Sequence, residues 1–312
     1  MATCAGKKTK VSRNPYEKVI LLIKDKIKEE YLNNLLVEIP KKYEKIGNLT
    51  LFPETSFSSE IWKEYMEEIC HIYKSERIAV KSTINDDNFR TPKVQFLFPF
   101  DCKDPWVMQK ELGLTIHYNI ERSMFCKGNI TEKERLAKLD CSNEIIVDLF
   151  AGIGYFSLVY LVHSKAKFVH ACEWNPAAIE ALQRNLQANK VQDRCKIYVG
   201  DNRMESPKNV GDRINLGILP SSEPFLQTAC ECLNLETGGI MHVHENINLF
   251  DDSNATEKYA NKLKYKIGDI LAKLTDKNWH ITVQFIHKVK SYGPRIDHVV
   301  IDIESRPQQE NK

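Results

Sequence analysis

The segment Ile145-Ile-Val-Asp-Leu-Phe-Ala-Gly-Ile-Gly-Tyr-Phe156 predicts the architecture of most of this chain. It opens with a short β-branched run without polar alternation, which is typical of a strand buried on both faces of a parallel sheet. Small residues, 151–154, then form a tight turn, and helical spacing begins at Tyr155. Strand, glycine turn and helix together predict the first unit of a doubly wound α/β sheet that binds a nucleotide.

Two further predicted strands end in polar residues. Glu173 follows the strand 168–172, and a carboxylate in this place can accept both hydroxyls of a ribose. Asp201 and Asn202 follow the strand 195–200 and suit the edge of an adenine. Because open α/β sheets bind ligands at the carboxyl ends of their strands, these residues favour an adenosyl cofactor over a packing turn. We expect Glu173 to face the ligand and to have little structural role.

Alternating strands and helices continue to the end of the chain. The pattern predicts a seven-stranded, mostly parallel, Rossmann-like sheet that ends in an antiparallel hairpin, as in class I methyltransferases. Thr131-Glu-Lys-Glu134 has the form of a capping box and predicts the start of a helix before the first strand. The other predicted elements are strands at 214–219 and 239–244, a helix at 259–274, and hairpin strands at 281–286 and 298–303.

The front of the chain has a different pattern. Residues 1–14 are polar and basic, and we expect a disordered tail. Residues 15–120 mix a helical pattern over 16–36 with shorter helix and strand signals, which predicts a smaller α+β domain. Residues 121–312 would then form the cofactor-binding domain.

Composition restricts the class of protein. With 312 residues, 42% hydrophobic and 28% charged, the chain has the balance of a soluble globular protein, and no apolar run is long enough for a membrane span. Nine cysteines without paired C-x-x-C spacing argue against structural zinc and for reduced thiols in the cytoplasm. The net charge is only +2, so any nucleic-acid surface must be a local patch.

Several short motifs together resemble the tRNA wybutosine-synthesizing protein 2 family, over nearly everything after residue 15. They are Asp148-Leu-Phe-Ala-Gly-Ile-Gly154, Cys172-Glu-Trp-Asn-Pro176, Gly200-Asp-Asn-Arg203, Leu219-Pro-Ser-Ser-Glu223, Gly128-Asn-Ile-Thr-Glu-Lys133, Val289-Lys-Ser-Tyr-Gly-Pro294, Leu51-Phe-Pro-Glu-Thr-Ser-Phe57 and Arg90-Thr-Pro92.

The resemblance implies transfer of the 3-amino-3-carboxypropyl group of S-adenosylmethionine to carbon 7 of 4-demethylwyosine, at position 37 of phenylalanine tRNA, without a metal. By position, Glu173 would hold the ribose, and Asp201 and Asn202 the adenine. Cys126 and Lys133 match the remaining cofactor contacts, although the family usually has serine where Cys126 stands. From composition alone, Lys133 would be a solvated helix residue. A monomer acting on the anticodon loop is expected.

Two other functions stay open. The related tRNA guanine-37 N1 methyltransferases carry Asn-Leu-Pro after the fourth strand, where this chain has Ile218-Leu-Pro220, and the missing amide counts against methyl transfer. A non-catalytic RNA-binding subunit is the third hypothesis. No general base is assigned, because the strand histidines are expected to be core residues. Candidate RNA-contacting cations are Arg90, Lys93, Lys288, Lys290 and Arg295.

Overall fold

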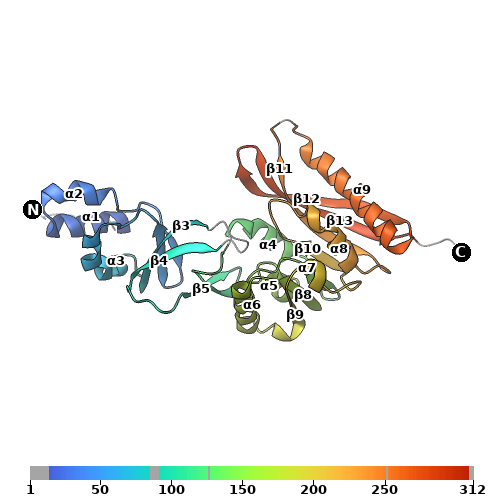
Figure 1. Cartoon of the computed structure of the whole chain (residues 1–312), viewed down its shortest axis with the longest axis horizontal. Coiled ribbons are helices and arrows are strands. Elements are labelled where there is room, and N and C mark those ends of the chain that lie inside the picture. Colours follow the sequence, from blue (N-terminus) through green and yellow to red (C-terminus); the bar gives the residue numbers. More distant parts are fainter. Residues whose placement is uncertain (1–13, 85–90, 126, 251, 309–312) are drawn as a thin grey trace, which may run out of the picture. The chain divides into compact units, whose positions relative to one another are not determined.

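The computed structural model describes residues 14–84, 91–125, 127–250 and 252–308 (Figure 1). The chain divides into two compact units, which are described separately below. The first contains residues up to 109 together with 119–122, and the second contains 110–118 and 123 onward. The predicted basic tail lies outside the described residues except Asn14, whose side chain accepts the Glu17 N–H at 2.8 Å and caps the first helix.

The first unit is a four-stranded sheet with short helices. Its strands lie in the order β1-β2-β3-β4, with β2 parallel to β3 and the outer pairs antiparallel. The helical pattern predicted over 16–36 is interrupted, because the backbone of Ile27 and Lys28 is extended. The elements are α1 (Pro15–Lys26), α2 (Glu29–Leu36), β1 (Glu44–Ile46), β2 (Leu49–Pro53), the 3-10 helix η1 (Glu60–Tyr65), α3 (Met66–Ile72), β3 (Arg77–Ile84) and β4 (Pro92–Phe98).

The second unit contains the predicted seven-stranded sheet, in the order β12-β13-β11-β10-β7-β8-β9. The five strands from β11 to β9 are parallel, and β13 runs antiparallel to both of its neighbours, which confirms the predicted fold class. The strands are β7 (Ile145–Asp148), β8 (Phe168–Glu173), β9 (Cys195–Val199), β10 (Arg213–Leu216), β11 (Gly239–Asn248), β12 (Trp279–Gly293) and β13 (Ile296–Pro307).

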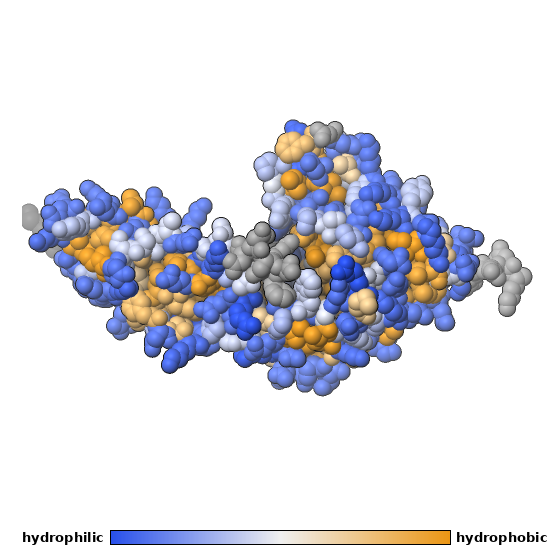
Figure 2. Space-filling view, viewed as in Figure 1, coloured by the Kyte–Doolittle hydropathy of each residue, from blue (hydrophilic) through white to orange (hydrophobic). Residues whose placement is uncertain are grey.

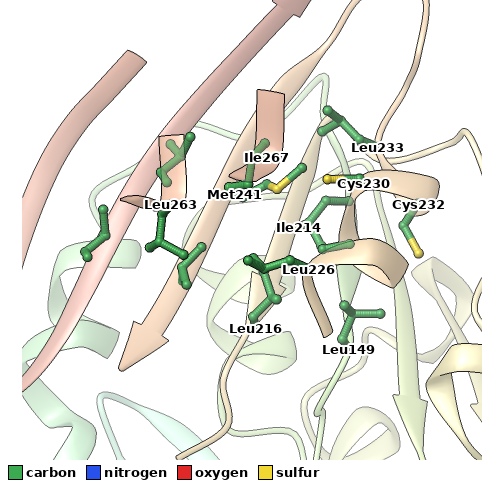
Figure 3. Close-up of a cluster of buried hydrophobic side chains, with 14 of the residues drawn as sticks. Leu149, Ile214, Leu216, Leu226, Cys230, Cys232, Leu233, Met241, Leu263 and Ile267 are labelled. Atoms are coloured by element: carbon green, nitrogen blue, oxygen red, sulfur yellow. The ribbon is translucent and has the colours of Figure 1, made fainter. Parts of the chain in front are cut away.

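Helices cover this sheet and bury its apolar side chains. On one face, Leu226 and Cys230 of α8 and Leu263 and Ile267 of α9 pack over β10 and β11, where Met241 is fully buried (Figure 3). Cys230 and Cys232, both on α8, are buried here. The helices are α4 (Ile130–Leu136), α5 (Ser157–Val162), α6 (Pro176–Ala188), α7 (Asn202–Glu205), α8 (Leu226–Cys232) and α9 (Ala255–Thr275).

A two-stranded hairpin, β5 (Trp106–Glu111) and β6 (Leu114–Asn119), precedes the large sheet. Asparagine amides from the region of α6 hold β6 by its backbone: Asn185 Oδ1 accepts the His117 N–H at 2.6 Å and Asn189 Oδ1 accepts the Thr115 N–H at 3.0 Å. Residues 110–118, which include the hairpin turn and most of β6, are therefore part of the second unit. The domain boundary expected at residue 120 stays a prediction.

Some local predictions are wrong. Thr131 does not cap α4, because the helix begins one residue earlier and the Thr131 hydroxyl donates to the carbonyl of Val289 at 3.1 Å. The strand predicted over 214–219 ends at Leu216, and both strands of the terminal hairpin are longer than their apolar patterns indicated. Pairing along the sheet edge extends a strand beyond the residues whose side chains are buried.

Across the described residues, no helix is long and apolar enough to cross a membrane. The face shown in Figure 2 carries mostly hydrophilic side chains with smaller apolar patches between them.

Candidate cofactor site

The site is built around the turn between β7 and α5. Gly152 and Gly154 have φ angles of +56° and +102°, a conformation that side chains disfavour. A Cβ on Gly154 would also lie 3.1 Å from atoms of Leu158 and Leu182. The Ala151 N–H donates to the Cys172 carbonyl at 3.0 Å, so the turn is tied to the neighbouring strand. Both glycines are therefore required by the backbone of this turn.

Glu173, at the end of β8, holds the turn with its carboxylate. Oε2 accepts the Gly152 N–H at 2.7 Å, and Oε1 accepts the N–H groups of Trp174 and Asn175 at 3.0 and 2.9 Å. Burial raises the pKa of this carboxyl, and the three backbone donors oppose that shift. Three of about four lone-pair sites are thus in use, which leaves one on Oε2 for a ligand. The expectation that Glu173 has little structural role is wrong.

Asp201 and Asn202 follow β9 as predicted but have different surroundings. Asp201 pairs with the Arg203 guanidinium at 2.9 Å, which lowers the pKa of its carboxyl. Asn202 is buried, and its Nδ2 donates to the carbonyl of Leu149 at 2.7 Å. Its Oδ1 is buried and has no hydrogen-bond partner in the part of the chain that the structure describes. A buried acceptor of this kind fits a donor supplied by a ligand.

Lys133, on α4, is only 1% exposed, so the solvated interpretation from composition is wrong. Its ammonium pairs with the carboxylate of Glu111 on β5. Two aromatic rings face the same ammonium: the Phe125 centroid lies 5.1 Å from Nζ and the Tyr155 centroid 5.4 Å. Tyr155 is part of the segment that follows the glycine turn, so Lys133 lies beside the turn that Glu173 holds.

A buried hydrogen-bond network next to the turn contains polar residues that the sequence analysis did not predict as site residues. Asp148, at the end of β7, is completely buried and accepts hydrogen bonds from Asn215 Nδ2 at 2.9 Å and Ser157 Oγ at 2.7 Å. Burial raises the pKa of Asp148. The network connects β7, β10 and the start of α5. Its signal in the sequence is the aspartate that ends the apolar run of 145–147.

His242 and His244 are buried, as expected of the strand histidines, whereas His170 on β8 is half-buried. His242 lies between Asp302, at 2.6 Å from Nδ1, and Arg213, at 2.9 Å from Nε2. His244 Nδ1 lies 3.1 Å from His298 Nε2, in a second buried pair. These contacts give the histidines a structural role within the sheet, and no general base is assigned to them.

Comparison with known proteins shows the family. A family model described as the TRM5/TYW2 methyltransferase domain matches residues 107–268, and one described as the TYW2 N-terminal domain matches residues 23–98. The tRNA wybutosine-synthesizing protein 2 homolog of Danio rerio is 38% identical over 308 residues, covering 89% of this chain and 75% of that protein. The chain belongs to the tRNA wybutosine-synthesizing protein 2 family.

Other relatives differ in length. The tRNA wybutosine-synthesizing protein 2/3/4 of Arabidopsis thaliana is 41% identical over 302 residues, which are 95% of this chain but only 29% of that protein. Among solved structures, the M. jannaschii TYW2 in complex with AdoMet is similar with a TM-score of 0.65 at 26% identity, over 86% of this chain and all of that one. The complex of aTrm5 and tRNALeu gives a TM-score of 0.64 at 26% identity, over 91% of this chain and 76% of that one.

For a member of this family, the structure brings most of the predicted site residues to one turn. Glu173 contacts its Gly152, Asn202 contacts its Leu149, and Lys133 faces its Tyr155. Asp201 is occupied by Arg203, and Cys126 lies outside the described residues. The unpartnered Asn202 acceptor, the positive-φ glycines and the buried ammonium all fit an adenosyl ligand with a charged arm. The described residues contain no cluster of His, Cys, Asp and Glu arranged to hold a metal.

Proposed function

We propose that this chain transfers the 3-amino-3-carboxypropyl group of S-adenosylmethionine to carbon 7 of 4-demethylwyosine, at position 37 of phenylalanine tRNA, releasing methylthioadenosine. The observation that carries this proposal is the meeting of an anionic and a cationic side chain at one glycine turn. Glu173 and Lys133 offer complementary partners for the ribose and for the carboxylate of the amino acid arm. The identity of the substrate base is inferred from membership of the family.

The site residues have separate roles in this proposal. The Oε2 atom of Glu173 accepts a ribose hydroxyl, and Asn202 and Asp201 lie toward the adenine. Lys133 binds the carboxylate, and Cys126 contributes its backbone. S-adenosylmethionine supplies a sulfonium with an electrophilic γ-carbon. The chain's own task is to hold that carbon about 3 Å from carbon 7 and in line with the bond to sulfur, which by itself supplies much of the rate.

The tRNA would bind at the same edge of the sheet. The tip of the β12–β13 hairpin lies at the carboxyl end of β11, and two aromatic side chains, Phe250 and Tyr292, are exposed there. Arg295 covers the Phe250 ring at 5.7 Å, so cation and ring form one surface suited to an unstacked base. Lys288 is paired with Asp297 at 2.7 Å and is less available. We propose that a monomer in the cytoplasm engages the anticodon loop here.

Methyl transfer to guanine 37 is the second candidate, favoured by the similarity to aTrm5. Against it stands Ile218, a half-buried apolar residue in the turn after β10. Nothing in that side chain can hydrogen-bond to guanine N1. The carbonyl of Pro220 in the same turn accepts the Asn246 N–H at 2.9 Å, so the backbone there is also committed to the sheet.

Isotope labelling tests the proposal. Hypomodified phenylalanine tRNA is incubated with S-adenosylmethionine labelled either in its methyl carbon or in its carboxyl carbon, and nucleoside 37 is examined by mass spectrometry. We expect only the carboxyl label in the RNA, with methylthioadenosine as the by-product. Methyl label in the RNA, with adenosylhomocysteine released, would establish the methyltransferase instead. A third result, no transfer and no cofactor binding, would favour the RNA-binding subunit.

A further inference from the structure

The ion pair between Lys133 and Glu111 is largely buried within the second unit. The lysine is 1% exposed and the glutamate side chain 16%, so both charges are largely removed from water. Burying such a pair costs free energy that the mutual attraction rarely exceeds, and apolar residues of similar volume would often be more stable. Because burying this ion pair costs free energy of folding, we infer that the pair has a role beyond stabilising the fold.

Contacts place this pair at the cofactor turn. A Cβ on Gly152 would lie 2.6 Å from the Tyr155 ring, which shows that the ring rests against the turn. The ammonium of Lys133 lies on the ring at 5.4 Å from its centroid, and the Gly152 N–H donates to Glu173. The ion pair and the carboxylate of Glu173 therefore flank the same four residues of the chain.

We propose that Lys133 and Glu111 together clamp the zwitterionic end of the amino acid arm, with Glu111 binding the α-ammonium and Lys133 the α-carboxylate. This inference rests on the proposed function and specifies how the same site holds the transferred group. The pair has no net charge, and neither does the zwitterion. Inserting one beside the other gives alternating charges, so no uncompensated charge is buried.

The clamp has a consequence for the position of the γ-carbon. The α-carbon carries both charged groups, and only two bonds separate it from the γ-carbon. Anchoring both groups therefore restricts the γ-carbon to a small region, as positioning for attack requires. The clamp therefore positions the γ-carbon, and the placement of the tRNA base decides whether that carbon or the methyl carbon is attacked.

Glu111 has a simpler possible role, which is to neutralise Lys133. The two roles differ in their dependence on the amino group of the ligand. If Glu111 binds the ammonium, Glu111→Gln weakens S-adenosylmethionine more than its analogue without the α-amino group. If Glu111 only neutralises Lys133, the substitution changes the affinities of both ligands by the same factor, since both carry the carboxylate.

Calorimetry on the full chain separates these outcomes, with three ligands: S-adenosylmethionine, its deaminated analogue, and methylthioadenosine, which has no arm. For Glu111→Gln we expect S-adenosylmethionine to lose about tenfold or more in affinity, and methylthioadenosine to stay within about twofold. The deaminated analogue should bind as well as or better than before, because Lys133 has lost its competing partner. The matched control is Glu134→Gln, an exposed carboxylate next to Lys133, which should change nothing.

If Glu111→Gln changes the affinities for S-adenosylmethionine and its deaminated analogue by the same factor, the clamp is overturned. If Glu111→Gln does not fold, the unaltered chain still tests whether Glu111 binds the ammonium. It should bind S-adenosylmethionine about tenfold or more tightly than the deaminated analogue, and equal affinities would refute this role of Glu111. The proposed function fails differently, because an unaltered chain that binds neither S-adenosylmethionine nor methylthioadenosine would not be this enzyme.

Discussion

Replacing Glu173 by glutamine should weaken the fold and the cofactor site together. The carboxylate accepts three backbone N–H groups, from Gly152, Trp174 and Asn175. A carboxamide has one accepting oxygen, so at least one of these donors loses its partner. A hydrogen bond to a charged group contributes about 1.5–3 kcal/mol. The amide avoids the desolvation that raises the pKa of Glu173, so we expect a net loss of about 1–2 kcal/mol.

Urea denaturation followed by circular dichroism measures this loss, and calorimetry with methylthioadenosine measures binding. We expect affinity for methylthioadenosine to fall by about tenfold, since the one free lone pair of Oε2 serves the ribose. Glu236→Gln, an exposed carboxylate far along the chain, is the control and should leave both quantities unchanged. Unaltered stability with unaltered affinity in Glu173→Gln would refute the three-donor arrangement and the ribose assignment.

Three further outcomes are expected. Burial lowers the pKa of His244 and brings that of His298 to about 4 from 6.5, so the unfolded state binds more protons between these values. The unfolding free energy should therefore fall as pH drops from about 6.5 to about 4, and a flat profile in pH-dependent melts would contradict it. Affinity for tRNA should fall steeply with salt, and alanine at Lys290 or Arg295 should each reduce the slope of log affinity against log salt by about 0.7–0.9; an unchanged slope would remove that residue from the interface. Gly154→Ala, at φ +102°, should lower the melting temperature and cost more than about 1 kcal/mol, which thermal unfolding will check against the wild type.

Much of the architecture was predictable because it follows local rules. The β-branched run before the glycine turn, and the polar residues after β8 and β9, identified a parallel sheet and its ligand edge. Buried strands show their period in the sequence, and a turn that needs positive φ shows its glycines. These rules failed where contacts with residues far away in the chain determine the local structure. The Thr131 hydroxyl, for example, donates to the Val289 carbonyl instead of capping its helix.

Sequence alone determined which strand ends carry the candidate ligand groups, since Glu173 follows Cys172 directly and Asp201 and Asn202 follow the predicted strand 195–200. Only the tertiary structure decided what those groups contact. Glu173 is 21 residues from the Gly152 that it holds, and Lys133 is 22 residues from the Glu111 with which it pairs. Such pairs leave no periodic signal in the chain. They form because a buried charge must find a partner, and only the folded sheet and hairpin bring the partner within reach.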